Sequence, residues 1–252
     1  MNCRQIHILV LGLILCGNKL YGADPTAEEL TKIRDALSRQ GAVFEHDANG
    51  AITTARIKGV AFNNSDFHQL TRLSSLESLF LKDTSVSDDG LSQLHLLKHL
   101  KTLAINGANV GDKGAIAIGR AATLQLLFMN DTQITDQALD HISLLKNLQG
   151  LELRRTRVTD SGVDKLKGMQ HLKWIYLSGT RISDQALDAL GSLRILESME
   201  LADTKITNAG LPKLGNSKSL QFLYLTGTHV TAVGVKTLKK QLPGLREVTY
   251  DK

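Results

Sequence analysis

The segment LESLFLKDTSVSD, from Leu76 to Asp88, returns along the chain at an interval of 24 residues. Its opening leucine recurs as Leu76, Leu100, Leu124, Leu148, Leu172, Leu196 and Leu220. A constant interval of this size is typical of stacked repeats, in which one unit cannot bury its apolar side alone and must pack on its neighbours. The sequence therefore predicts a solenoid, and the question of function becomes what its exposed face binds.

The pattern within one repeat predicts a short strand, a turn and a helix. Counted from the opening leucine as position 1, the consensus is L-x-x-L-x-L-x-x-T-x-[VI]-[TS]-D-x-[GA]-[LV]-x-x-L. Apolar positions 4 and 6 alternate with 3 and 5, so 4 and 6 should point inward. Positions 16 and 19 have helical spacing. Position 15 is Gly or Ala, which indicates close packing. We expect an α/β solenoid of about eight repeats, with strands forming a parallel sheet on its concave face.

Two polar columns recur with the repeat. Position 9 holds Thr84, Thr132, Thr156, Thr180, Thr204 and Thr228, and position 13 holds Asp88, Asp112, Asp136, Asp160 and Asp184. Columns of hydroxyl and carboxylate groups are also found in metal and catalytic sites. In a repeat protein, however, they more often satisfy backbone groups at turns and helix starts. We therefore interpret both columns as structural ladders, with no metal site.

These motifs resemble the leucine-rich repeats that have a Thr-x-Val-Thr-Asp-x-Gly-Leu core. Such repeats are abundant in exported bacterial proteins, especially those of planctomycetes. They are also similar to the repeats of F-box-associated and antagonist-of-mitotic-exit-type proteins. The resemblance covers about residues 52–250 and implies a leucine-rich-repeat solenoid, a scaffold that hosts many binding roles.

The N-terminus has the pattern of a secretory signal peptide. Arg4 precedes an apolar run from Ile8 to Cys16, and small residues follow up to Ala23. We predict a signal peptide over residues 1–22 and an exported protein, periplasmic or secreted from a bacterium. An uncleaved membrane tether and lipidation at Cys16 are the alternatives. Because Cys3 and Cys16 are the only cysteines, the mature chain would have no disulfide.

The rest of the chain divides into three parts. Residues 23–51 are predicted to form an N-terminal helical cap, with a capping box in Thr26-Ala-Glu-Glu29 and a turn at residues 47–50. The repeats occupy 52–244, and 245–252 should form a closing strand, displaced by one residue. Without residues 1–22 the chain has 28 basic and 25 acidic residues, a net charge of +3 that does not indicate nucleic-acid binding. The basic residues at position 23 of the repeats could bind an acidic polymer, or could interact favourably with the helix dipole at the helix ends.

Outward positions 3, 5 and 7 of the strands contain the candidate binding residues. Six of the eleven aromatic residues of the chain fall at positions 3 and 5, in every second repeat. With strands about 4.8 Å apart, they should form aromatic rows roughly 10 Å apart. The candidate set is Phe80, Phe128, Glu152, Arg154, Trp174, Tyr176, Glu200, Phe222 and Tyr224.

Exposed aromatic patches mark interaction sites, and aromatic residues dominate protein interfaces. We therefore predict a non-enzymatic scaffold that binds a protein partner through the concave face. Binding of a glycan, self-association of the solenoid, and simple packing of aromatics across strands remain alternatives. His95 and His99 are four apart but lack a third metal ligand, and the chain has no nucleophilic Gly-x-Ser-x-Gly motif or phosphate loop. We predict no cofactor.

Overall fold

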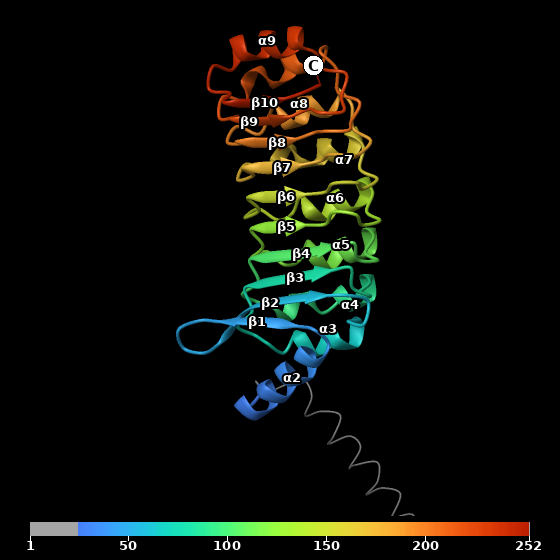
Figure 1. Ribbon diagram of the computed structural model, residues 1–252, viewed down its shortest axis with the longest axis vertical. Coiled ribbons are helices and arrows are strands. Elements are labelled where there is room, and N and C mark those ends of the chain that lie inside the picture. The colour runs from blue at the N-terminus through green and yellow to red at the C-terminus, as the bar shows by residue number, and fades with distance from the viewer. Residues whose placement is uncertain (1–24, 252) are drawn as a thin grey trace, which may run out of the picture.

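The computed structural model describes residues 25–251, and within them one ten-stranded sheet runs the length of the molecule (Figure 1). The strands follow one another in chain order, β1 antiparallel to β2 and all others parallel. They are β1 Val43–His46, β2 Ile52–Lys58, β3 Ser78–Lys82, β4 Thr102–Asn106, β5 Leu126–Phe128, β6 Gly150–Glu152, β7 Trp174–Tyr176, β8 Ser198–Glu200, β9 Phe222–Tyr224 and β10 Glu247–Thr249. The predicted α/β solenoid is confirmed.

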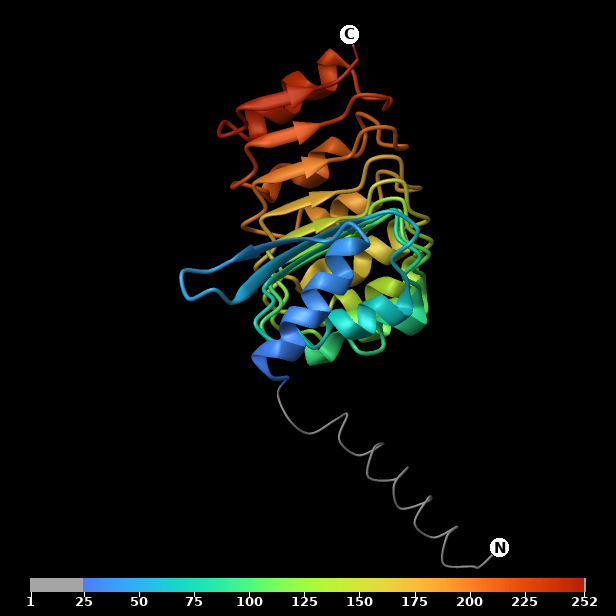
Figure 2. The ribbon, with the colours of Figure 1, turned by 60° about the horizontal axis from the view of Figure 1, so that its bottom comes forward.

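The helices of the repeats lie together on one side of the sheet and leave its other side open (Figure 2). They are α3 Asn64–Leu70, α4 Asp88–Leu91, η2 Leu94–Leu96, α5 Asp112–Ile118, α6 Asp136–Ile142, α7 Asp160–Asp164, η3 Lys165–Gly168, α8 Ala186–Leu190, η4 Leu211–Asn216 and α9 Ala232–Gln241. Most are one or two turns long, and η2, η3 and η4 are 3-10 helices. The predicted helix of each repeat is therefore present, but it is shorter and more mixed than an α-helix.

The sheet pairs in the register that the 24-residue period predicts. Leu79 pairs with Leu103, and each later repeat continues that row. The row ends with Leu223 opposite Val248, which is the predicted displacement by one residue. Positions 4 and 6 are buried in one continuous core, while positions 3 and 5 are mostly half-buried.

The threonines of position 9 hold the turn that follows each strand. Thr132, Thr156, Thr180, Thr204 and Thr228 donate their hydroxyls to the carbonyl three residues earlier, at 2.6–2.7 Å. Thr84 is equally buried, but its hydroxyl has no partner among the described residues. Five of the six threonines in this column therefore satisfy a backbone carbonyl.

The aspartates of position 13 reach from one repeat to the next. Asp160 accepts the backbone N–H of Ser183 at 2.7 Å, the Ser183 hydroxyl at 2.6 Å and the N–H of Ala186 at 3.2 Å. Asp88, Asp112, Asp136 and Asp184 accept the equivalent backbone N–H at 2.7–2.8 Å. Each carboxylate thus caps the following repeat, which the sequence reasoning did not specify.

This reach explains the small residue at position 15. A Cβ atom added to Gly162 would overlap the Asp136 carboxylate of the preceding repeat, and Gly210 stands in the same relation to Asp184. The first repeat has no preceding aspartate, and its helix α3 is capped from within by Asn63 and Asp66. In the first repeat Asn64 makes the contact to the next one, and the aspartates begin with Asp88 in the second repeat.

Position 8 of every repeat has a left-handed backbone. Four of these residues are glycines, at 59, 107, 179 and 227, and the others are Asp83, Asp131, Arg155 and Asp203 with φ of 52–59°. Gly and Asp tolerate this conformation, whereas Arg normally avoids it. Arg155 is held there by two hydrogen bonds to Asp131, at 2.5 and 2.6 Å. The turn after each strand of the repeats therefore has the same feature, a residue with positive φ.

The N-terminal end of the sheet is covered by α2 Ala27–Arg39 and by the hairpin of β1 and β2 (Figures 1 and 2). The predicted capping box is present, because Thr26 N–H bonds Glu29 Oε2 at 2.9 Å and Glu29 N–H bonds Thr26 Oγ1 at 3.3 Å. Ile33 and Leu37 are buried in the core. The expected signal peptide and the candidate lipidation site Cys16 lie outside the described residues.

Candidate binding face

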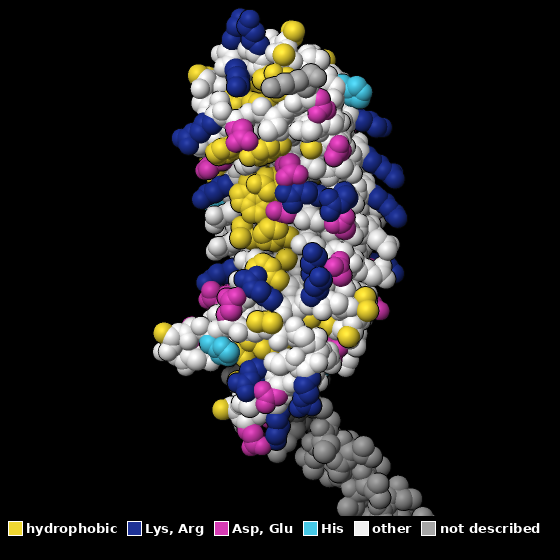
Figure 3. Space-filling model, in the orientation of Figure 1, with side chains coloured by type: hydrophobic (Ala, Val, Ile, Leu, Met, Phe, Trp, Pro, Cys, Tyr) yellow, Lys and Arg dark blue, Asp and Glu magenta, His cyan; other side chains and the backbone are white. Residues whose placement is uncertain are grey.

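The open side of the sheet has a band of hydrophobic side chains along its middle, with charged groups beside it (Figure 3). The aromatic residues predicted for this face are all half-buried at outward positions of β3, β5, β7 and β9. The structure divides them into three groups. Phe80 lies near one end, Phe128, Trp174 and Tyr176 lie in the middle, and Phe222 and Tyr224 lie on β9. We call the middle three residues the aromatic shelf.

The aromatic shelf is continuous across three strands. The ring centroids of Phe128 and Trp174 are 5.6 Å apart with an interplanar angle of 45°, and those of Trp174 and Tyr176 are 5.1 Å apart with an angle of 33°. Both centroid distances lie in the range of favourable aromatic contacts. The predicted separation of roughly 10 Å between aromatic rows is therefore wrong for β5 and β7.

Gly150 is the reason that these rings meet. It lies on β6 directly opposite Trp174, and a Cβ atom built on it would overlap the indole ring. Trp174 therefore lies over Gly150 and reaches Phe128 on the strand beyond. Sequence reasoning identified the aromatic positions but assigned no role to this glycine. The sequence contained one sign of that role: a glycine occupies the same repeat position as the only tryptophan, one repeat earlier.

Arg154 joins the shelf to the charged residues beside it. Its guanidinium carbon lies 4.6 Å from the centre of the Tyr176 ring, within the range of a cation–π contact. Two of its nitrogens donate to the two carboxylate oxygens of Glu200, at 2.8 and 2.6 Å. A third donates to Glu152 at 2.5 Å. Arg154 therefore spans from β6 to β8 across the face of Tyr176.

Neighbouring polar residues hold this charged cluster in place. Asn130 donates to Glu152 at 2.7 Å and accepts the backbone N–H of Arg154 at 2.8 Å. Ser178 donates to Glu200 at 2.8 Å. Two carboxylates thus surround one guanidinium, and the cluster has a net charge of −1. Arg155, the next residue along the chain, pairs with Asp131 instead.

The outer aromatic groups are separate from the shelf. Phe80 lies against Arg56, whose guanidinium carbon is 4.1 Å from the ring centre, and the small side chain of Ala104 follows it on β4. Tyr224 lies opposite Glu200. Burial, followed by the negative charge of Glu247, raises the pKa of the Tyr224 hydroxyl. Among the described residues, the rings of the shelf are the ones that contact one another.

The pKa of Glu200 sets the pH below which the charged cluster should lose its contacts. Hydrogen bonds from Arg154 and Ser178 lower this pKa, although burial opposes them. The contribution of the ionised Glu200 to the stability of the fold is therefore complete above the usual glutamate pKa of about 4.3. It is lost as the pH falls through the lowered pKa of Glu200 in the folded protein. We expect the fluorescence of Trp174, the only tryptophan, to be constant from pH 8 to 5 and to change below about pH 4.

The matched variant for this titration is Glu200→Gln, which keeps the shape and removes the ionisation. Its fluorescence should lack the acid transition while circular dichroism shows an unchanged fold. The same transition in the variant would show that Trp174 reports general acid unfolding and not the state of Glu200.

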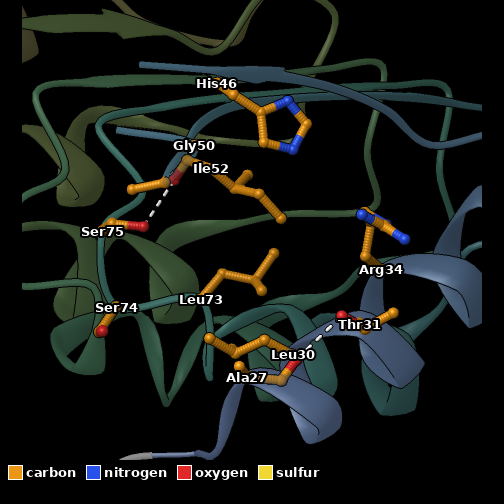
Figure 4. A pocket seen from close by; sticks show the side chains of 11 residues that line it. Ala27, Leu30, Thr31, Arg34, His46, Gly50, Ile52, Leu73, Ser74 and Ser75 are labelled. Carbon is orange, nitrogen blue, oxygen red and sulfur yellow. Dashed lines mark hydrogen bonds between the residues drawn. The ribbon is translucent and has the colours of Figure 1, made fainter. Parts of the chain in front are cut away.

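Elsewhere, the structure contains a hollow of about 270 Å³ between α2 and the β1–β2 hairpin. The apolar side chains of Leu30, Ile52 and Leu73 line it, together with His46 and Arg34 (Figure 4). In the part of the chain that the structure describes, no cluster of three or more His, Cys, Asp or Glu residues could hold a metal ion. Over the same residues, no helix is long and apolar enough to cross a membrane.

Comparisons with known proteins agree with this geometry. A family model described as Leucine Rich repeat matches residues 97–119. Internalin C2 of Listeria monocytogenes is similar over 79% of this chain and 81% of its own, with 23% identity and a TM-score of 0.64. The internalin inlF of the same organism matches over 78% of this chain and 52% of its own, with 22% identity and a TM-score of 0.61.

A leucine-rich-repeat protein of Leptospira interrogans matches over 72% of this chain and 50% of its own, with 20% identity and a TM-score of 0.52. The comparison with curated proteins gave no match. At these identities the likeness concerns the fold. The protein is therefore a leucine-rich-repeat solenoid, and its particular role has to be argued from its own surface.

Proposed function

We propose that this protein is a non-enzymatic binding scaffold that recognises a protein partner through the aromatic shelf and the Arg154 cluster. The observation that carries the proposal is that three aromatic rings contact one another on the open side of the sheet and are only half-buried. An apolar surface of this kind on a soluble domain marks an interaction site. Phe80, Phe222 and Tyr224 would extend the contact along the sheet.

Rigidity supports this proposal. Trp174 is confined by Phe128, Tyr176 and the backbone at Gly150, so its ring is already ordered before any partner arrives. A preorganised side chain loses little entropy on binding, which leaves more of its contact energy as affinity. Aromatic and arginine side chains are also the residues that most often dominate interfaces. The shelf with Arg154 combines both types in one place.

A glycan is the second candidate, and the polar groups beside the aromatic shelf favour it. Asn130, Glu152 and Arg154 form a hydrogen-bonded row, in which Arg154 lies over the Tyr176 ring and Glu152 pairs with Tyr176 across the strands. Sugar rings combine an apolar face with hydroxyl groups, so a ring stacked on Trp174 could exchange hydrogen bonds with that row. A protein partner is preferred because the aromatic positions extend over seven strands, from β3 to β9.

We also propose that the chain is exported, as a periplasmic or secreted bacterial protein. Support comes from the sequence of residues 1–22, with an apolar run behind a single basic residue. The partner would then be sought outside the cytoplasm. Self-association of two solenoids through the same face is the further possibility that the experiment has to separate.

The test is retention of a partner by immobilised residues 23–252 from the extracytoplasmic fraction of the source organism. Trp174→Ala should weaken retention by about 30-fold or more, the equivalent of about 2 kcal/mol for an interface hot spot. The matched control is Leu144→Ala, which removes an exposed apolar side chain on the helical side. Circular dichroism should be unchanged in both variants.

The outcomes are distinct. Loss in Trp174→Ala with retention in Leu144→Ala supports the open face as the site. Protease digestion of the extract should then abolish retention, whereas periodate oxidation abolishing it would identify a glycan. A mass in solution that rises with concentration would identify self-association. Equal retention by both variants would move the site away from the shelf.

A further inference from the structure

A row of basic residues lies on a different part of the molecule, beyond the turn that follows each strand. Position 10 holds Arg157, Arg181 and Lys205 in three successive repeats, and His229 in the next, all exposed. In the three preceding repeats the same position holds Ser85, Asn109 and Gln133. We call residues 157, 181, 205 and 229 the basic row. Figure 3 shows Lys and Arg side chains one above another along one edge of the molecule.

The side chains of the basic row have no partners in the described part of the chain. None of the four forms an ion pair or a side-chain hydrogen bond there, whereas Arg154, Arg155 and Lys213 all pair with carboxylates. In the position 23 column, Lys146 and Lys218 each donate to a backbone carbonyl at 3.0 Å, whereas Lys98 and Arg194 also have no side-chain partner among the described residues. The carboxylates of Asp160 and Asp184 lie nearby in the repeat, but they are occupied by N–H groups of the next repeat.

The backbone keeps these side chains in a line. Each member of the row donates its N–H to the carbonyl of position 11 in the repeat before it, at 2.9–3.1 Å. Successive members are thus separated by about the strand spacing, ~4.8 Å. Like charges at this distance repel one another, so the row is unfavourable for the protein alone. A ligand with a regular series of negative charges would remove that repulsion.

We propose that the basic row binds a linear acidic polysaccharide, with one carboxylate for each sugar ring. A pyranose ring with its linkage is about as long as the interval between neighbouring strands. Successive rings of such a polymer turn relative to one another, and the long arginine and lysine side chains can reach carboxylates on either side of it. In an extended acidic peptide, successive side chains are about 3.3 Å apart and those on one face about 6.6 Å apart, and neither interval matches the row. Single-stranded nucleic acid is held by aromatic stacking as well as charge, and the row has no aromatic member.

The test is direct binding of oligogalacturonates of two, four and eight units, measured by fluorescence anisotropy at low salt. Affinity should rise from two to four units and change little at eight, because the row has four members. The triple variant Arg157→Gln/Arg181→Gln/Lys205→Gln should raise the Kd for the four-unit ligand at least tenfold. Glutamine is chosen because Gln133 already occupies this position in an earlier repeat.

A matched control removes the same charge elsewhere. Lys98→Gln/Lys146→Gln/Arg194→Gln alters three residues of the position 23 column and should leave the Kd within about twofold. A gain-of-function variant, Asn109→Arg/Gln133→Arg, lengthens the row by two repeats and should make eight units bind more tightly than four. Trp174→Ala should have no effect, which separates this site from the shelf.

Several results would overturn the proposal. An equal loss in both charge-removing triple variants would reduce the binding to net charge. Tighter binding of oligoglutamate or of oligothymidylate than of the four-unit oligogalacturonate would assign the row to another class of polymer. Absence of binding at 50 mM salt to all oligogalacturonates would remove the site altogether, since that condition favours charge–charge contacts.

Discussion

Gly150→Val is expected to expel Trp174 from the aromatic shelf while leaving the solenoid folded. Even a methyl group at residue 150 would overlap the indole ring, whereas valine itself suits a strand. The ring must therefore rotate toward solvent and lose its contact with Phe128, which costs about 0.5–1.5 kcal/mol. The emission of the only tryptophan should shift to longer wavelength and become more accessible to acrylamide.

The binding consequence should be larger than the effect on stability. A partner that needs the ordered ring should bind Gly150→Val about 30-fold or more weakly, as for loss of a hot spot. Thr102→Val is the control, because it occupies the same strand position on β4, two strands before Gly150. Unchanged fluorescence in Gly150→Val would show that Trp174 does not depend on this glycine for its position.

Asp160→Ala is expected to cause a large loss of stability for a change outside the apolar core. It leaves the N–H groups of Ser183 and Ala186, and the Ser183 hydroxyl, without their acceptor. Loss of a helix cap costs about 1 kcal/mol and each unsatisfied buried donor about 1–3 kcal/mol. We expect a loss of about 3 kcal/mol in the free energy of unfolding, measured by urea denaturation.

Asp160→Asn is the matched variant, and the chain itself supplies the precedent. Asn64 and Asn208 occupy this position in other repeats. Their side-chain oxygens accept the N–H of Ser87 and Thr231 at 2.9 and 3.0 Å, and their amides donate to the hydroxyls of the same two residues. The asparagine variant should therefore lose less than about 1 kcal/mol. Equal losses in both variants would mean that the charge, and not the acceptor, stabilises the junction.

The sequence predicts the repeat geometry because the same positions of every unit are apolar and become buried against the neighbouring units. Leu79 and Leu103 occupy the same place in identical units, so their pairing follows from the period alone. The displacement of Val248 against Leu223 was also predictable, since Pro243-Gly244 marks an extra residue. Local capping at Thr26 and Glu29 could be recognised from four adjacent residues.

The candidate site was less predictable because its contacts join residues in different repeats. The side chain of Trp174 lies over Gly150 on the neighbouring strand, and this orientation is possible because Gly150 has no side chain. Arg154 and Glu200 are 46 residues apart and meet across Tyr176. A period of 24 residues identifies outward positions, but it does not give the direction in which long side chains turn. For the same reason the reach of Asp160 into the next repeat was not specified.

The aspartate ladder also gives the solenoid a direction of growth. The side-chain oxygen at position 13, an aspartate in five repeats and an asparagine in two, completes the unit after it, as Asp136 does for Thr159. A repeat newly made on the ribosome therefore meets an acceptor that is already in place. The first helix needs none, because Asn63 and Asp66 close it from within. Shortening the chain from its C-terminal end thus removes backbone donors, and the acceptor of the last remaining unit can turn to water. Shortening it from the N-terminal end removes acceptors and leaves the backbone N–H groups of the next unit without a partner.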